Sequence, residues 1–191
     1  MSSPQSFPSV PMLPVVIVLA AGRGERFAAS GGSTHKLDAL LAGTAVRDHV
    51  LAAVRASGLP HHVVQADASR PGMGDSIAAG VRATAGAPGW LILPADLPLI
   101  RSDTLRQVAL APASRVLVPI YRGQRGHPVR FSAACGSALM NLKGNQGAAP
   151  VLYDSSAINS VAFLELDDVG IVTDIDTVQD LARAEALLAA R

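Results

Sequence analysis

The feature that most constrains this chain is an apolar segment that runs directly into a glycine-rich loop. Residues 15–19 read as a buried strand, and the sequence continues Ala-Ala-Gly-Arg-Gly-Glu-Arg-Phe. Small residues let a backbone approach a ligand closely, and their N–H groups can surround an anion. Arg23, Arg26 and Lys36 follow in the same loop, where their charges would balance those of a polyphosphate. The segment therefore predicts a nucleoside triphosphate cradle.

Two common phosphate-loop patterns do not explain this loop. The dinucleotide fingerprint needs a third glycine where Phe27 stands, and the Walker A lysine precedes Ser or Thr, whereas Lys36 precedes Leu37. The alternative is an ordinary glycine-rich loop with solvated arginines. The position of this loop after a hydrophobic first strand favours the triphosphate cradle over an ordinary loop, because open α/β sheets bind ligands beyond the carboxyl ends of their strands.

Composition limits the class of protein. The 191 residues suit one domain, which we expect over residues 14–191 after a flexible tail, residues 1–13. Net charge is +1 without a run of Lys or Arg, so nucleic-acid binding is not expected. The single Cys135 excludes an internal disulfide and fits a cytoplasmic location. Residues 15–21 are too few to span a bilayer, so no membrane association is expected.

Strand-like and helix-like segments alternate along the chain. This order predicts an α/β fold, with a mainly parallel sheet covered by helices on both faces. We expect strands at 15–19, 62–65, 90–93, 116–121, 128–131, 161–166 and 171–175. We expect helices at 45–57, 75–84, 102–110, 132–142 and 147–154, and a final helix capped by Thr177.

Carboxylates follow two of these predicted strands. Asp96 ends an apolar segment between Pro94 and Pro98, a position that suits Mg²⁺ coordination or, alternatively, the start of a turn. Asp174 and Asp176 precede the final helix, and strand alternation would put both on one face. Asp176 is equally suited to capping that helix. Together with the loop, these acids predict metal-assisted phosphoryl or nucleotidyl transfer.

Three smaller motifs are compatible with ligand contacts. Ser76, in Gly-Met-Gly-Asp-Ser, can bond a base or ribose, or the motif is a plain helix start. His127, in Gly-His-Pro, is more often structural or exposed than functional. The turn Gly-Asn-Gln-Gly at residues 144–147 opens a helix and can form a second anion site.

In order and spacing, these pieces resemble the MobA/MocA-like nucleotidyltransferase family, most closely its molybdenum cofactor cytidylyltransferase branch. The resemblance spans about residues 15–188 and implies a three-layer α/β/α sandwich of the nucleotide-diphosphosugar-transferase type, with a mixed sheet. The matching segments are Leu19-Ala-Ala-Gly-Arg-Gly-Glu-Arg-Phe27, Lys36-Leu37, Gly72-Met-Gly-Asp-Ser76, Asp96-Leu-Pro98, Gly126-His-Pro128, Gly144-Asn-Gln-Gly147 and Asp174-Ile-Asp-Thr177.

The resemblance implies that the phosphate of molybdopterin attacks the α-phosphorus of CTP or GTP and that pyrophosphate leaves. Arg26 and Lys36 would stabilise charge on the triphosphate, and Asp96 would hold Mg²⁺ with Asp174 or Asp176. His127, Asn145 and Gln146 would face the acceptor. Nucleotide-binding residues would be Leu19, Ala20, Ala21, Gly22, Arg23, Gly24, Gly74, Ser76 and Ala95.

Ala21 favours CTP, because the guanylyltransferase branch usually has glycine at this position. Three departures accompany the resemblance. Ten positions separate Arg26 from Lys36, several more than usual, and one strand precedes Gly72 where the family has two strands and a helix. The family's Gly-Asp-x-Gly-Ala-Arg turn reads Gly-Asn-Gln-Gly-Ala-Ala here.

Two alternatives stay open, and the altered turn motivates the first of them. One is nucleotidyl transfer to another phosphorylated acceptor, such as a sugar or polyol phosphate. The other is a non-catalytic nucleotide- or cofactor-binding protein that helps to load a client molybdoenzyme.

Overall fold

The computed structural model describes residues 12–69, 72–153 and 161–191. The predicted tail lies outside the described residues except for its last two positions. The central sheet has seven strands in the order β4-β1-β5-β8-β6-β7, and β9 also pairs with β6. Their bounds are β1 Val15–Ala20, β4 His61–Gln65, β5 Gly89–Pro94, β6 Val116–Tyr121, β7 Gln124–Arg125, β8 Val129–Ser132 and β9 Val161–Glu165.

Five of the seven strands in this sheet run in the same direction. β4, β1, β5, β6 and β9 run in one direction, and β7 and β8 run against them. β1 lies between β4 and β5, with Val18 opposite both Val63 and Leu93. A strand with neighbours on both edges and helices on both faces needs an almost continuous apolar sequence, which is what residues 15–19 provide. The predicted mixed, mainly parallel sheet is confirmed.

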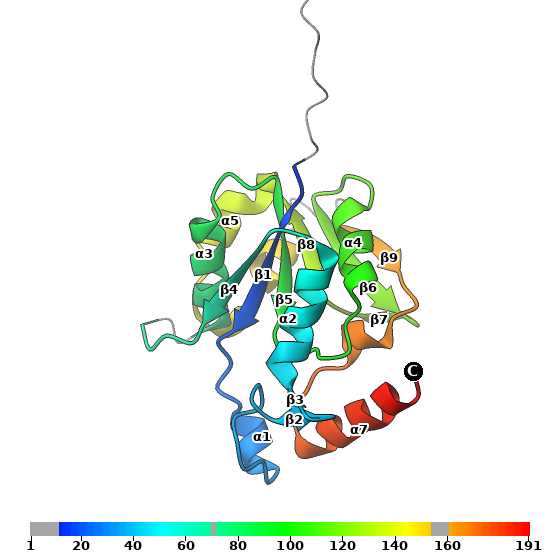
Figure 1. Cartoon of the computed structure of the whole chain (residues 1–191). Coiled ribbons are helices and arrows are strands. Elements are labelled where there is room, and N and C mark those ends of the chain that lie inside the picture. The colour runs from blue at the N-terminus through cyan, green and yellow to red at the C-terminus, as the bar shows by residue number, and fades with distance from the viewer. Residues whose placement is uncertain (1–11, 70–71, 154–160) are drawn as a thin grey trace, which may run out of the picture.

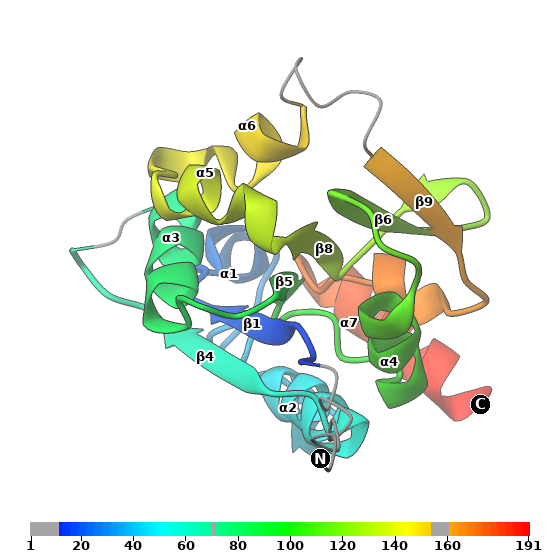
Figure 2. The ribbon, with the colours of Figure 1, turned by 90° about the horizontal axis from the view of Figure 1, so that it is seen from above.

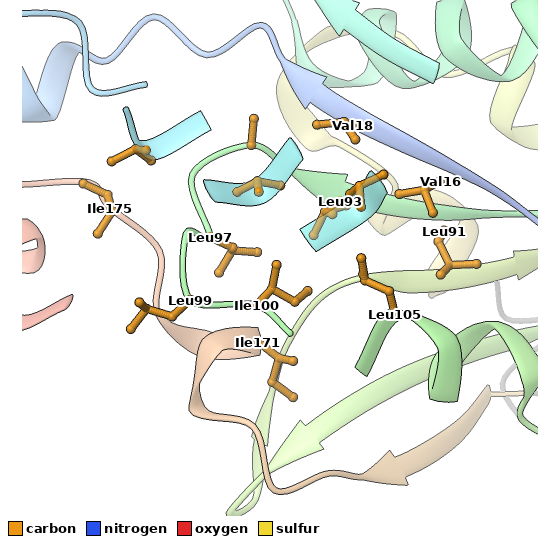
Figure 3. Close-up of a cluster of buried hydrophobic side chains, with 14 of the residues drawn as sticks. Val16, Val18, Leu91, Leu93, Leu97, Leu99, Ile100, Leu105, Ile171 and Ile175 are labelled. Carbon is orange, nitrogen blue, oxygen red and sulfur yellow. The ribbon is translucent and has the colours of Figure 1, made fainter. Parts of the chain in front are cut away.

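Helices cover both faces of the sheet (Figures 1 and 2). α2 (Val46–Ser57) and α4 (Ser102–Leu110) pack on one face. α3 (Met73–Ala83), α5 (Gly136–Met140) and α6 (Ala149–Leu152) pack on the other. A hydrophobic core lies on each face of the sheet. β1 and β5 contribute side chains to both cores, since neighbouring residues of a strand point to opposite faces. Figure 3 shows the first core, where Val16, Val18, Leu91 and Leu93 meet Leu105.

A third group of elements gathers beyond the carboxyl ends of the parallel strands (Figure 1). It contains α1 (Glu25–Ala29), the hairpin of β2 (Leu40–Leu41) and β3 (Thr44–Ala45), and α7 (Val178–Ala189). Ala42 and Gly43 join the two hairpin strands, and both have positive φ, at 48° and 82°. α1, β2, β3 and β7 are too short to show periodicity in the sequence, and we did not predict them.

The prediction of a strand at residues 171–175 is wrong. Val169–Val172 form a turn of 3-10 helix, and the chain then continues without a strand partner among the described residues. The buried carboxylate of Asp168 accepts from Gly170 N at 3.0 Å and starts this helical turn. Ile171, Thr173 and Ile175 are buried at every second position, as the residues on one face of a strand would be. This spacing explains why the sequence pattern predicted a strand.

Other differences are confined to element ends. The expected helix over 132–142 is a 3-10 turn, Ala133–Cys135, followed by α5, and the helix expected over 147–154 is the four-residue α6. Residue 154 lies outside the described residues. The single strand expected before Gly72 is the sheet's edge strand β4. Within the described ranges, no helix combines the length and apolar character needed to cross a bilayer.

Candidate active site

A cavity of about 390 Å³ opens where β1 and β5 end. Its walls come from the loop after β1, the segment at Lys36, the start of α3, and the residues that follow β5. The lining residues are Leu19, Ala21, Gly22, Arg23, Gly24, Glu25, Arg26, Phe27, Lys36, Leu37, Gly72, Met73, Ser76, Pro94, Asp96, Asn145 and Asp176. The cavity therefore brings together most of the residues that the sequence singled out.

The glycine-rich loop is fixed to the segment before Lys36 by His35, a residue that the sequence patterns did not single out. The ring Nε2 of His35 lies 2.8 Å from the carbonyl oxygen of Gly22, to which it donates, and its Nδ1 accepts from Leu37 N at 3.3 Å. Gly24 has φ of 69°, the left-handed conformation that glycine adopts most easily, and α1 begins immediately after it. The only sequence signal for His35 is its position next to Lys36.

Lys36 joins the two predicted carboxylate positions. Its Nζ donates to Asp96 Oδ2 at 2.6 Å and to Asp176 Oδ1 at 2.9 Å. The side chain of Lys36 is 10% exposed, and those of Asp96 and Asp176 are 16% and 18% exposed. Burial alone would lower the pKa of Lys36, but the charges and hydrogen bonds of both carboxylates outweigh it and raise the pKa above its ordinary value. Lys36 is therefore a firmly charged ammonium in the cavity wall.

Arg26 extends this charge network to the cavity mouth. Its Nη2 lies 2.7 Å from Asp176 Oδ2, and the arginine side chain is 77% exposed. Arg23 pairs with Glu25 at 3.5 Å, and both of these side chains are largely exposed. Three cations thus line the half of the cavity next to the glycine-rich loop, where an anion could be bound.

The Asp96 carboxylate has the character of a metal ligand. Its Oδ1 is buried and has no hydrogen-bond partner among the described residues, although burying an unpaired carboxylate oxygen is costly. Asp176 supplies a second carboxylate beyond the shared lysine. Mg²⁺ typically takes one or two carboxylates together with substrate phosphates, so this donor set fits it. No group of three or more His, Cys, Asp or Glu side chains could form an all-protein metal site within the described ranges.

Asp174 and Asp176 do not share one environment, although alternation predicted a common face. Asp174 is exposed and does not line the cavity. Although the residue is exposed overall, partial burial of its carboxyl group and the charges of Asp96, Asp176 and Asp180 raise its pKa, while its own backbone N–H partly opposes this rise. The helix cap belongs to Thr177, whose side chain accepts from Asp180 N, as predicted. This leaves the carboxylate of Asp176 available to Lys36 and Arg26.

The start of α3 forms the opposite wall. Ser76 is buried and lines the cavity, with its Oγ 3.3 Å from Gly72 O. The glycines of this motif serve packing within the protein. A Cβ on Gly72 would lie 2.2 Å from Gly144 O, and one on Gly74 would lie 2.8 Å from Lys143 O. Asn145 of the neighbouring turn, the 3-10 helix Gly144–Gln146, also lines the cavity.

Several predicted residues lie outside the cavity lining. Ala95 is 1% exposed and packs in the core, while its N–H donates to Leu19 O at 3.1 Å. Burial lowers the pKa of His127, and the charges of Asp96 and Asp174 only partly offset this. The imidazole therefore lies near both acids but is neutral at neutral pH. The predicted residues outside the lining are Ala20, Gly74, Ala95, His127, Gln146 and Asp174.

A mainly parallel sheet, with a glycine-rich loop after its first strand and two carboxylates at its carboxyl edge, is typical of α/β transferases that bind nucleotides. The description "MobA-like NTP transferase domain" belongs to the family model that matches residues 16–161. The purine catabolism protein PucB of Bacillus subtilis (strain 168) is 33% identical over a match that covers 86% of this chain and 92% of PucB. The chain belongs to the MobA-like NTP transferase family, as predicted, and is a nucleotidyltransferase of that family.

Solved structures support the fold. A nucleotidyl transferase from Methanothermobacter superposes with a TM-score of 0.75 at 22% identity, covering 94% of this chain and 99% of its own. Rv0371c from Mycobacterium tuberculosis H37Rv gives a TM-score of 0.73 at 23% identity, covering 93% and 99%. A second structure of Rv0371c is a manganese complex. The predicted fold class is confirmed.

Proposed function

We propose that this protein transfers CMP from CTP to the phosphate of molybdopterin or its molybdenum-loaded form and releases pyrophosphate. The observation that carries the proposal is the bridge from Lys36 to Asp96 and Asp176 beside the glycine-rich loop. In this bridge, the lysine supplies a cation for phosphate oxygens, and the two aspartates supply carboxylates for a divalent metal. The proposal also assigns the protein to the cytoplasm, in keeping with its single cysteine.

In this reaction, an oxygen of the acceptor phosphate forms a bond to the α-phosphorus as the bond from that phosphorus to the pyrophosphate oxygen breaks. The acceptor phosphate is already ionised, so the protein needs no strong general base. Lys36 and Arg26 stabilise the charge that develops on the leaving pyrophosphate, and the loop at residues 20–24 holds the base, ribose and phosphates. Catalysis then rests on alignment and charge.

Asp96 and Asp176 are the residues that we assign to Mg²⁺. When bound, the ion would neutralise charge on the triphosphate and help to orient it. The unpartnered Oδ1 of Asp96 supports this assignment. The manganese complex of Rv0371c, a protein of the same fold, is compatible with a divalent ion in this class. Asp174, exposed and outside the cavity wall, would assist from a distance.

CTP is favoured over GTP by Ala21, which lines the cavity. Its methyl group reduces the space next to the base and therefore suits a pyrimidine. The acceptor is the less constrained substrate, because the turn at residues 144–149 lacks the acid and arginine of the resembling family. A sugar or polyol phosphate acceptor is the alternative that this turn motivates.

Pyrophosphate release tests the proposal. The full chain is incubated with Mg²⁺, each of the four NTPs, and molybdopterin or a polyol phosphate as acceptor. We expect release with CTP and molybdopterin. Release with a polyol phosphate alone would overturn the proposed acceptor. Nucleotide binding without release for any acceptor would instead support a non-catalytic maturation protein that serves a molybdoenzyme.

A further inference from the structure

We infer that Asn145 is a specificity-determining residue that contacts the nucleobase, and not an acceptor-binding residue. The inference rests on the proposed function, because it takes a nucleoside triphosphate as the occupant of the cavity. Asn145 lines the same cavity as Ser76 and Met73 of α3, whereas His127 and Gln146 do not line it. Of this turn, Asn145 therefore belongs to the nucleotide side of the site.

The turn is fixed directly to the start of α3. The space where Gly72 and Gly74 would carry a Cβ is filled by the backbone of Lys143 and Gly144, so the two segments touch without intervening side chains. The carboxylate of Asp75 accepts from Gly72 N at 3.2 Å and from Gly144 N at 3.0 Å. This one side chain clamps both segments, so Asn145 keeps a defined position relative to Ser76.

The charges in the cavity are separated, and this separation identifies the base end. All the charged lining residues, the cations Arg23, Arg26 and Lys36 and their acidic partners Glu25, Asp96 and Asp176, come from the loops after β1 and β5, the segment at Lys36 and the approach to α7. The lining residues from α3 and the turn carry no charge. A wall made of a thioether, a hydroxyl and a carboxamide suits a neutral aromatic ring better than a triphosphate. The triphosphate and its divalent ion therefore suit the charged part of the cavity, which directs the base towards Asn145.

A carboxamide is suited to reading a base edge. The side chain of Asn145 offers an oxygen acceptor beside an NH₂ donor, and cytosine and guanine each present adjacent donor and acceptor atoms. A carboxylate at the same position could only accept. Asn145→Asp should therefore change which base is preferred, whereas Asn145→Ala should weaken binding of the preferred nucleotide.

Binding measured without acceptor tests this inference. Dissociation constants of CTP, GTP and inorganic tripolyphosphate are measured with Mg²⁺ for the full chain and its variants. We expect Asn145→Ala to raise the Kd of the preferred nucleotide by about 5- to 10-fold and to leave the Kd of tripolyphosphate unchanged. We expect Asn145→Asp to change the ratio of the CTP and GTP values. Asn141→Ala is the matched control, because Asn141 is exposed, bonds Ser137 O and does not line the cavity.

Two results would overturn the inference. One is unchanged nucleotide affinity in Asn145→Ala with a raised KM for the acceptor. The other is an equal loss of nucleotide and tripolyphosphate affinity, which would assign Asn145 to the phosphates. The affinities decide the role of Asn145 even if no acceptor supports pyrophosphate release, a result that would overturn the proposed transfer alone.

Discussion

The Nζ atom of Lys36 lies 2.6 Å from Oδ2 of Asp96, across sixty positions of sequence. The same Nζ reaches Asp176, so one ammonium joins the segment after the glycine-rich loop, the end of β5 and the approach to α7. Ile175 N also donates to Asp96 O at 2.9 Å, which fixes the two acid-bearing segments side by side. The predictions below test what this arrangement does.

Asp96→Asn should abolish turnover and leave the fold intact. The amide retains the shape of the carboxylate but supplies no negative charge to a metal, and Lys36 keeps its partner Asp176. We expect pyrophosphate release to fall by at least about 100-fold with little change in melting temperature. Turnover like that of the wild type would remove Asp96 from the metal role.

Lys36→Met should destabilise the protein, because it leaves the Asp96 carboxylate without a counter-ion close to the Asp176 carboxylate, which keeps only the exposed Arg26. Removing one partner of a buried ion pair typically costs about 3 kcal/mol. Adding Asp176→Asn should restore about 1 kcal/mol or more, since it removes one of the two negative charges. Urea unfolding of the single and double variants measures this coupling. Strictly additive losses would contradict the bridge.

Arg26→Ala should impair catalysis without affecting stability. The Arg26 side chain is largely exposed and Asp176 keeps Lys36 as a partner, so the pair contributes less than about 1 kcal/mol, whereas loss of a cation at the triphosphate should lower kcat/KM by about 100-fold. Arg23→Ala should lower kcat/KM by about 10-fold or less, because Arg23 pairs with its exposed neighbour Glu25 and not with the partly buried acids.

Steady-state kinetics with varied CTP, together with thermal unfolding, compare these two arginine variants. Arg55→Ala, on α2 and away from the cavity, is the control. Equal losses in the Arg26 and Arg23 variants would remove the special role of Arg26.

The start of α7 should depend on pH through Asp180. Partial burial would raise the pKa of Asp180, but hydrogen bonds from the Thr177 side chain and from Thr177 and Asp176 N–H, with the Arg183 charge, lower it below its ordinary value. A carboxyl with a lowered folded pKa stabilises the protein above its unfolded value of about 3.9, and this stabilisation is lost as pH falls through the folded value. Asp180→Ala should therefore cost about 1 kcal/mol at pH 6.

The loss of unfolding free energy caused by Asp180→Ala should shrink as pH falls below about 4. Below that pH the wild-type carboxyl is progressively protonated and loses its ionic hydrogen bonds. Unfolding free energies from pH 2 to pH 7 measure the difference. Glu185→Ala, on the same helix, is the control. A cost that does not vary with pH would show that the stabilisation does not depend on the ionised carboxylate.

Sequence patterns gave the main elements because their signals are local. The apolar run before the glycines, the alternation of strands and helices, and the Thr177 cap each depend on residues within a few positions, and each was found. The error at 171–175 has a local explanation as well. Asp168, through its carboxylate, starts a helical turn at Gly170, and the backbone bonds of this segment go to His127 and Asp96 instead of a strand ladder.

The sequence by itself determined the class of fold and the chemistry of the phosphate loop, since periodicity and residue type carry both. Only the tertiary structure decided which second acid Lys36 bridges to Asp96, and that Asn145 lines the cavity together with Ser76 while His127 does not. Lys36 and Asp176 are 140 positions apart. Their contact depends on how the chain returns to the carboxyl edge of the sheet, and no local sequence pattern encodes that path.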